Sequence, residues 1–277
     1  MSAVRLSMNE LSTYRWTIDE DLHYYEKYGF DGIGVWRRKL NDFGVERGIE
    51  LIAESGVAVS NLMWAGGFTG NDGRSQEESI ADAMQAIELA DAINARCLVL
   101  YTGGRNYHTR RHASRLIRSA LEDLLPMAEA RGVTLAVEPM HPACAGEWTL
   151  LTSLDTTLCL LEEYRSDALQ LVLDTYHFPD ASDDELAAIA PKTAVVHLAD
   201  IVAPHSIDQQ RSQIGEGHIE LSRIMGTMVA NGYQGFFDIE LLGADTDPED
   251  YEQLVLQASQ RGAELLSGAL PFASSSY

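Results

Sequence analysis

Four short apolar runs in this sequence each end in a side chain that can bind a hard divalent metal ion. The runs are rich in Val, Leu, Ile and Phe, as buried strands of a parallel sheet are. The residues that end them are Glu138, Asp174, His197 and Glu240. A polar group at the tip of a buried strand fits badly in a core but well at the mouth of a barrel, where active sites lie. Three carboxylates and one imidazole therefore predict a divalent-metal site with room for substrate oxygens.

Strand-like runs and amphipathic helical stretches alternate along the whole chain. Besides the four tips above, we expect strands to end near Asn9, Trp36, Trp64 and Tyr101. Eight strands alternating with about eight helices predict an α/β fold of the (β/α)8 TIM barrel type, with residues 1–277 as a single domain. A doubly wound open sheet is the alternative. Such a sheet usually has a glycine-rich loop after its first strand, and residues 9–12 contain no glycine.

Several helix boundaries can also be predicted. Thr17 and Ser75 are suited to cap the helices that begin just after them, because a hydroxyl can accept a hydrogen bond from a free backbone N–H. Gly132 and Gly232 follow helical stretches and are expected to end them.

Composition excludes several classes of partner. The net charge of −22 makes nucleic acid an unfavourable partner and disfavours an anionic membrane surface. No apolar run approaches the roughly 18 residues that a membrane span needs. Residues 1–7 lack the pattern of a secretory signal. Cys97, Cys144 and Cys159 are odd in number and widely spaced, which fits reduced thiols and predicts a cytoplasmic protein.

Two histidines follow strand tips at the same offset. His177 lies three residues after Asp174, where it can orient a bound substrate oxygen, serve as a fifth metal ligand, or be an ordinary loop residue. His141 lies three residues after Glu138 and is open to the same readings. Trp64, at the expected end of the third strand, is a candidate substrate-binding residue.

Two loops contain basic side chains. Arg211, in the loop after His197, is a fixed cation that can hold a substrate oxygen. Gly215 and Gly217 follow it, but Glu216 between them argues against phosphate binding there. Residues 103–112 form the most basic stretch of the chain. They either lie at the rim of the pocket and recognise an anionic substrate or partner, or form a solvated loop.

These motifs together resemble the xylose isomerase-like TIM barrel superfamily of sugar and cyclitol isomerases and epimerases, inosose isomerases among them. The resemblance covers nearly the whole chain. Its clearest segments are residues 135–138, 171–178, 196–200, 211, 215–219 and 238–241.

The resemblance implies a function for each candidate residue. Glu138, Asp174, His197 and Glu240 would hold one divalent metal ion, and the two glutamates would also carry the substrate proton. His177 and Arg211 would contact substrate. Oxygen-rich ligation favours Mn²⁺, with Mg²⁺, Co²⁺ or Zn²⁺ as alternatives. The expected activity is isomerisation or epimerisation of a keto sugar or an inosose-like ketocyclitol through a metal-bound enediolate.

Other functions remain open from sequence alone. A lyase of the same superfamily can dehydrate its substrate or eliminate the aglycone of a 3-keto-glycoside, C-glycosides included, with His141 as the leaving-group acid. A sugar-binding barrel without activity is a second alternative. A Schiff-base aldolase would need a lysine at a strand tip, and only Lys39 comes close. The expected partner is a small molecule. A homo-oligomer is expected by resemblance, or a complex with a small second subunit if the protein is a lyase.

Overall fold

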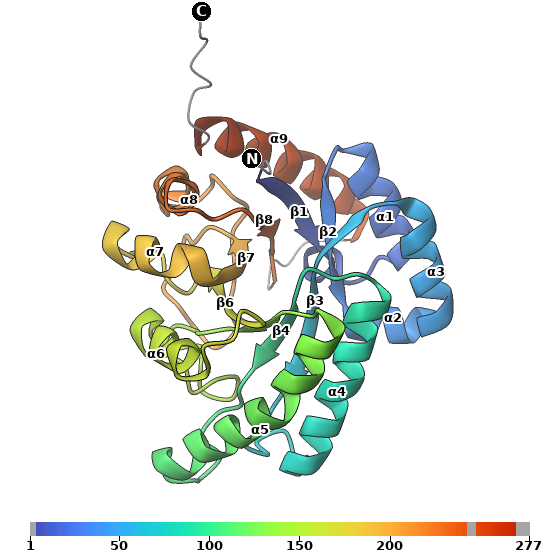
Figure 1. Cartoon of the computed structure of the whole chain (residues 1–277). Coiled ribbons are helices and arrows are strands. Elements are labelled where there is room, and N and C mark those ends of the chain that lie inside the picture. Colours follow the sequence, from blue (N-terminus) through green and yellow to red (C-terminus); the bar gives the residue numbers. More distant parts are fainter. Residues whose placement is uncertain (1–3, 243–247, 270–277) are drawn as a thin grey trace, which may run out of the picture.

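The computed structural model describes residues 4–242 and 248–269. Eight parallel strands close into a barrel in chain order, and helices surround it, so the predicted (β/α)8 TIM barrel is confirmed (Figure 1). The strands are β1 Arg5–Asn9, β2 Gly32–Trp36, β3 Ala58–Gly66, β4 Leu98–Tyr101, β5 Leu135–Val137, β6 Leu169–Asp174, β7 Thr193–Leu198 and β8 Phe236–Ile239.

The α-helices are α1 Ile18–Lys27, α2 Arg37–Phe43, α3 Val45–Ser55, α4 Gln76–Ala92, α5 Arg110–Arg131, α6 Leu154–Tyr164, α7 Asp183–Ile189, α8 Leu221–Ala230 and α9 Tyr251–Ala269. Three short 3₁₀ helices are η1 Glu10–Thr13, η2 Ala190–Lys192 and η3 Pro248–Asp250. In the described part of the chain, no helix combines the length and apolar character needed to cross a membrane.

The predicted helix boundaries are confirmed. The backbone N–H of Thr17 donates to the carboxylate of Glu20 at 2.8 Å, which forms a capping box at the start of α1. Ser75 caps α4 in the same way. Gly132 takes the left-handed conformation directly after α5, and Gly232, with φ +97°, lies just beyond α8.

The third strand extends further than the sequence suggested. We expected it to end near Trp64, whereas β3 continues to Gly66. Gly66 has φ +134°, and a Cβ there would lie 1.9 Å from the carbonyl oxygen of Tyr101. Because any larger residue at position 66 would clash with Tyr101, glycine is needed for β3 to pass this close to β4. Since β3 continues to Gly66, Trp64 lies within the strand and not at its end.

Side chains alternate between the two faces of each barrel strand. On β8, Phe237 and Ile239 pack outward in the main core with the helices, whereas Phe236 belongs to a second cluster inside the barrel. The same inner cluster contains Val172 of β6. Because successive side chains point to opposite faces, the residue two positions further along each strand also points inward. Asp174, two residues after Val172, is therefore directed into the barrel mouth.

A buried polar cluster lies inside the barrel around Asp238. Its carboxylate accepts hydrogen bonds from Ser7 Oγ at 2.5 Å, Asn9 Nδ2 at 2.7 Å, Asn61 Nδ2 at 2.8 Å and Ser60 Oγ at 3.2 Å. All five residues are fully buried. Two of the donors come from β1 and two from β3, so one side chain of β8 ties three strands together.

We predict that Asp238→Ala destabilises the barrel by at least about 3 kcal/mol, because it leaves four buried donors without an acceptor. Ser60→Ala removes two longer hydrogen bonds, one donated to Asp238 at 3.2 Å and one accepted from Asn61 at 3.1 Å, and should cost only about 2 kcal/mol. Urea unfolding of the two variants and the wild type measures both values. A loss below 1 kcal/mol for Asp238→Ala would contradict the importance of this cluster.

Candidate metal and substrate site

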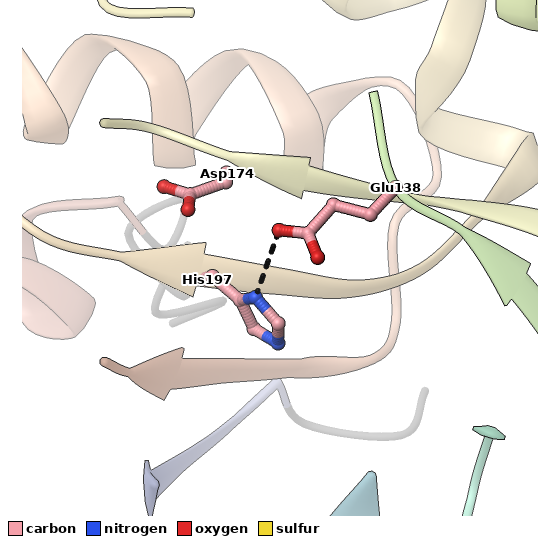
Figure 2. A group of neighbouring side chains, drawn as sticks. All are labelled: Glu138, Asp174 and His197. Atoms are coloured by element: carbon pink, nitrogen blue, oxygen red, sulfur yellow. Dashed lines mark ion pairs between the residues drawn. The ribbon is translucent and has the colours of Figure 1, made fainter. Parts of the chain in front are cut away.

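The predicted metal ligands converge at the carboxyl ends of β5 to β8. Glu138, Asp174 and His197 are buried, and each offers a ligand atom within 4.8 Å of those of the other two (Figure 2). Asp174 and His197 are register partners across β6 and β7, which places them at one level of the barrel. Figure 2 shows all three side chains directed toward a common region, with an ion pair between His197 and Glu138.

Glu240 approaches the same imidazole from β8. Its Oε2 atom lies 2.9 Å from His197 Nδ1, and Glu138 Oε1 lies 3.6 Å from that nitrogen. Within residues 4–242 and 248–269, neither His197 nitrogen nor Glu240 Oε2 makes a hydrogen bond, although all three atoms are buried. Buried polar atoms rarely lack partners. A buried imidazole nitrogen and carboxylate oxygens this close together are a set of donor atoms that fits a divalent cation.

Arg211 supplies a positive charge beside this cluster. Its Nη2 atom donates to Asp174 Oδ2 at 2.6 Å and lies 3.5 Å from Glu240 Oε1, and its side chain is buried. Three ionised carboxylates with one guanidinium carry a net charge of −2. A single divalent ion neutralises that charge, which agrees with the donor set.

The carboxylates differ in acidity because their neighbours differ. Burial raises the pKa of Asp174, but the adjacent Arg211 outweighs it and brings the pKa to about 2. Burial acts on Glu240 in the same direction, yet Arg211 and His197 lower its pKa below the ordinary value. For Glu138, which lies further from the guanidinium, burial dominates and the pKa is raised.

His177 lies beside the cluster as predicted. Its Nε2 atom is 3.7 Å from Asp174 Oδ2, and neither of its ring nitrogens has a hydrogen-bond partner among the described residues. Burial lowers its pKa to about 4, so the ring is neutral at physiological pH. A neutral imidazole with free nitrogens can donate to or accept from a substrate oxygen.

A pocket opens above the cluster, with an empty volume of about 370 Å³. One wall carries Glu138, Arg211 and Glu240. The opposite wall is aromatic and contains Trp64, the predicted substrate-binding residue, together with Tyr101 and Trp148. The ring of Trp148 packs edge to face on Trp64 at 5.4 Å and on Tyr101 at 5.6 Å.

Sequence reasoning assigned no function to Tyr101 or Trp148. Tyr101 was expected only as the end of a strand, and Trp148 lies in a long loop after β5 without a local motif. The one available signal was the number of aromatic residues at expected strand ends, since Trp36, Trp64 and Tyr101 all occur there.

His141 lies apart from this pocket. Its ring stacks on that of His205, with centroids 3.9 Å apart and planes inclined by 11°. Burial and the neighbouring His205 lower its pKa. It is not among the residues that line the pocket. Its predicted action as a leaving-group acid therefore gains no geometric support and stays a prediction.

The glycine loop after β7 folds around a carboxylate of its own chain. The backbone N–H groups of Gly215 and Ile219 donate to Asp200 at 3.1 and 3.0 Å. Glu216 forms an ion pair with Arg261 at 3.0 Å. Because Asp200 already takes these donors, the loop is not a phosphate site, in line with the sequence-based reading.

We predict that His177 makes the metal-free protein less stable as the pH falls from about 6.5 to 4. Its pKa is about 4 when folded, against an ordinary value of 6.5, so in this window only the unfolded chain takes up the proton. The free energy of unfolding should fall by about 1.4 kcal/mol per pH unit from this group. Urea unfolding between pH 7 and 5 should show a shallower slope for His177→Asn. His23→Asn, at an exposed position, is the control. Equal slopes for wild type and His177→Asn would contradict the prediction.

Comparison with known proteins adds relatives of this fold and site. An inosose isomerase of Halalkalibacterium halodurans is 24% identical over 267 residues, covering 90% of this chain and 91% of that protein. The structure of an IOLI protein with a binding zinc atom has a TM-score of 0.82 at 21% identity, covering 97% and 100% of the two chains. The 3-keto-D-glucoside 4-epimerase YcjR from E. coli has a TM-score of 0.77 at 17% identity, covering 95% and 99%.

The family comparison agrees with the geometry. Residues 22–259 match the family model described as xylose isomerase-like TIM barrel, which is most of the chain. The closed parallel barrel is the fold that the sequence predicted, and Glu138, Asp174 and His197 come together at its strand ends. This chain belongs to the xylose isomerase-like TIM barrel family.

Proposed function

We propose that this protein is a divalent-metal-dependent isomerase or epimerase of a keto sugar or an inosose-like ketocyclitol. The observation that carries the proposal is the buried group of Glu138, Asp174, His197 and Glu240, whose donor atoms lie close together and two of which, Glu138 and Glu240, line a pocket that also has aromatic residues in its lining. An inosose isomerase and a keto-glucoside epimerase among the relatives support the substrate class.

Glu138, Asp174, His197 and Glu240 would hold the metal ion. Mn²⁺ is our first assignment, with Mg²⁺, Co²⁺ or Zn²⁺ as alternatives, and the zinc atom of the IOLI protein supports a divalent ion at this fold. When bound, such an ion acts as a Lewis acid that polarises a carbonyl and acidifies the adjacent C–H group.

The two glutamates are placed to move the substrate proton. Glu138 follows β5 and Glu240 follows β8, three strands apart in the ring, so they reach a substrate from different sides. One carboxylate removes the proton next to the carbonyl, which gives the enediolate of the substrate. The other glutamate, which must first take a proton from water, gives that proton to the neighbouring carbon or to the opposite face, and the first glutamate later releases its proton to water. When the neighbouring carbon is protonated, the proton of the adjacent hydroxyl moves to the former carbonyl oxygen. The first outcome is isomerisation and the second is epimerisation.

Other side chains orient and enclose the substrate. Two nitrogens of Arg211, Nε and Nη1, are buried and have no hydrogen-bond partner among the described residues, and they can donate to a substrate hydroxyl or to the negative oxygen that forms on proton removal. The neutral ring of His177 can hold a second oxygen. Trp64, Tyr101 and Trp148 offer an apolar face to the C–H side of a sugar or cyclitol ring and keep water away from it.

The lyase alternative lacks a comparable feature. Elimination needs an acid close to the leaving group, and His141 was the candidate. His141 packs on His205, whereas Glu138 and Glu240 both line the pocket, and this supports proton transfer as our first proposal.

We further propose a cytoplasmic enzyme with one catalytic domain over residues 1–277. Cys97, Cys144 and Cys159 are all free thiols, which supports a reducing compartment. The family match over residues 22–259 leaves only short segments at each end.

The metal assignment predicts about one divalent ion bound per chain in the purified protein. His197→Ala and Asp174→Ala should each lose this ion, because each removes a ligand. Trp64→Ala, in the opposite wall of the pocket, should keep it, and Arg211→Ala should keep it too. Elemental analysis by mass spectrometry gives the content of each variant. A wild-type protein that binds no divalent ion, and whose activity a chelator leaves untouched, would overturn the metal site.

The reaction is tested by incubating the enzyme with keto sugars, inososes and 3-keto-glycosides in D₂O and following the products by NMR. Deuterium uptake at carbon without loss of a group supports the isomerase or epimerase, whereas an unsaturated product or a free aglycone identifies a lyase. Glu138→Gln and Glu240→Gln should each slow the exchange by at least roughly 10²-fold, because the amide cannot accept the proton. A variant that exchanges at the normal rate would show that its glutamate is only a metal ligand.

A further inference from the structure

The basic stretch noticed in the sequence has no function in the site described above. Residues 103–121 contain five of the chain's 20 basic residues and none of its 42 acidic residues. They form the loop after β4 and the first half of α5. This stretch is therefore a local positive patch on a protein whose net charge is −22.

Three arginines of this stretch are free to bind a partner. Arg105, Arg110 and Arg111 are exposed, and within the described chain they form no ion pair. Tyr107 lies between them with its side chain 101% exposed. Tyrosine and arginine are the residues that most often dominate the energy of protein interfaces. We refer to Arg105, Tyr107, Arg110 and Arg111 as the basic turn.

The basic turn is held in a fixed shape. Asn106 Nδ2 donates to the carbonyl oxygen of Thr69 at 3.0 Å, and a ring nitrogen of His108 lies 3.2 Å from the same oxygen. The backbone N–H of Gly103 donates to the carbonyl of Trp148 at 2.8 Å. Asn106 and Tyr107 both have positive φ, +43° and +61°. A non-glycine pair in this region is strained, and it projects Tyr107 outward from an ordered loop.

A complementary acidic turn lies nearby on the same chain. Asp180, Asp183, Asp184 and Glu185, between β6 and the first turn of α7, are all exposed. Asp183 pairs with Arg223, and Glu185 closes the capping box of Ser182. Asp180 and Asp184 form no ion pair among the described residues. We refer to Asp180 and Asp184 as the acidic turn.

The two turns flank one helix of the outer ring. Helices α5, α6 and α7 follow one another around the barrel, so α6 lies between the turns (Figure 1). All three helices begin at the end of the barrel where the strands end. The groove between α5 and α6 begins at Arg110 and has apolar residues such as Ile117, Leu150 and Leu160 among its lining. A positively charged turn, a groove with both apolar and polar residues in its lining, and a negatively charged turn therefore follow one another along this rim.

We propose that this rim is a two-fold interface with a second copy of the same chain. A two-fold axis near α6 places the basic turn of each copy on the acidic turn of the other, since a symmetric interface uses the same surface twice. The charge complementarity comes from one chain alone, which is why the partner is a second copy rather than an unrelated acidic protein. Tyr107 is the aromatic anchor of each half.

Charge reversal tests the proposal. Sedimentation velocity at low salt should show a dimer for the wild type and monomers for both Arg110→Glu/Arg111→Glu and Asp180→Lys/Asp184→Lys, because each variant then faces like charges. An equimolar mixture of the two variants should associate again, since both turns of the arginine variant are negative and both turns of the aspartate variant are positive. Tyr107→Ala should weaken the wild-type dimer by at least about 10-fold.

Arg38→Glu/Arg47→Glu is the matched control, because it changes the net charge equally but lies on α2 and α3, across the barrel. It should associate like the wild type. Circular dichroism verifies that each variant is folded. A monomeric wild type, a reversed variant that still associates fully, or a mixture that stays monomeric would each overturn the proposal.

Discussion

In each barrel strand every second side chain points into the barrel, and this alternation determines which residues can reach the site. Each strand from β5 to β8 buries an apolar side chain inside the barrel, and the next inward position, two residues on, carries a polar group at or near the strand end. Because the strands are hydrogen-bonded in register around a closed ring, these ends reach similar levels. A shift of one residue in any strand would turn its ligand outward into the helices. The site thus depends on the register of the barrel.

Charge compensation then shapes the site. Asp174, Glu138 and Glu240 are buried close together, and such a group of like charges is unfavourable without counter-ions. Arg211 provides one buried counter-charge and pairs most closely with Asp174. In the part of the chain that the structure describes, the imidazole of His197 also faces these carboxylates. Its pKa is raised well above the ordinary value because Glu240 and Glu138 outweigh the opposing effect of burial. An imidazole that attracts a proton so strongly is equally a strong ligand for a metal ion.

Sequence reasoning located the strand-borne part of the site and missed the rest. Glu138 and Asp174 could be found because a carboxylate after an apolar run has few structural explanations. Asp238 was not singled out, since its four partners come from distant strands, and nothing local to residues 236–239 indicates them. Trp148 was missed for the same reason, because it reaches the pocket through the fold of a long loop. Local patterns predict what one strand does, whereas walls built from several loops need the three-dimensional structure.

The proposed reacting groups lie at strand ends, whereas part of the pocket lining lies in a loop, and this difference has a chemical consequence. The glutamates and the other residues proposed to bind the metal ion lie at the ends of hydrogen-bonded strands, which are rigid and cannot change without disturbing the barrel. Trp148, opposite them, lies in the loop after β5, and Tyr101 closes the short strand β4 that precedes the basic turn. Loops tolerate substitution far better than strands. Of the three aromatic residues that line the pocket, Trp64 and Tyr101 lie on strands and Trp148 lies in a loop, so we expect Trp148 to be the one that can vary most while the proposed proton-transfer residues stay in place. Relatives with under a quarter of their residues in common retain the same fold, as this separation requires.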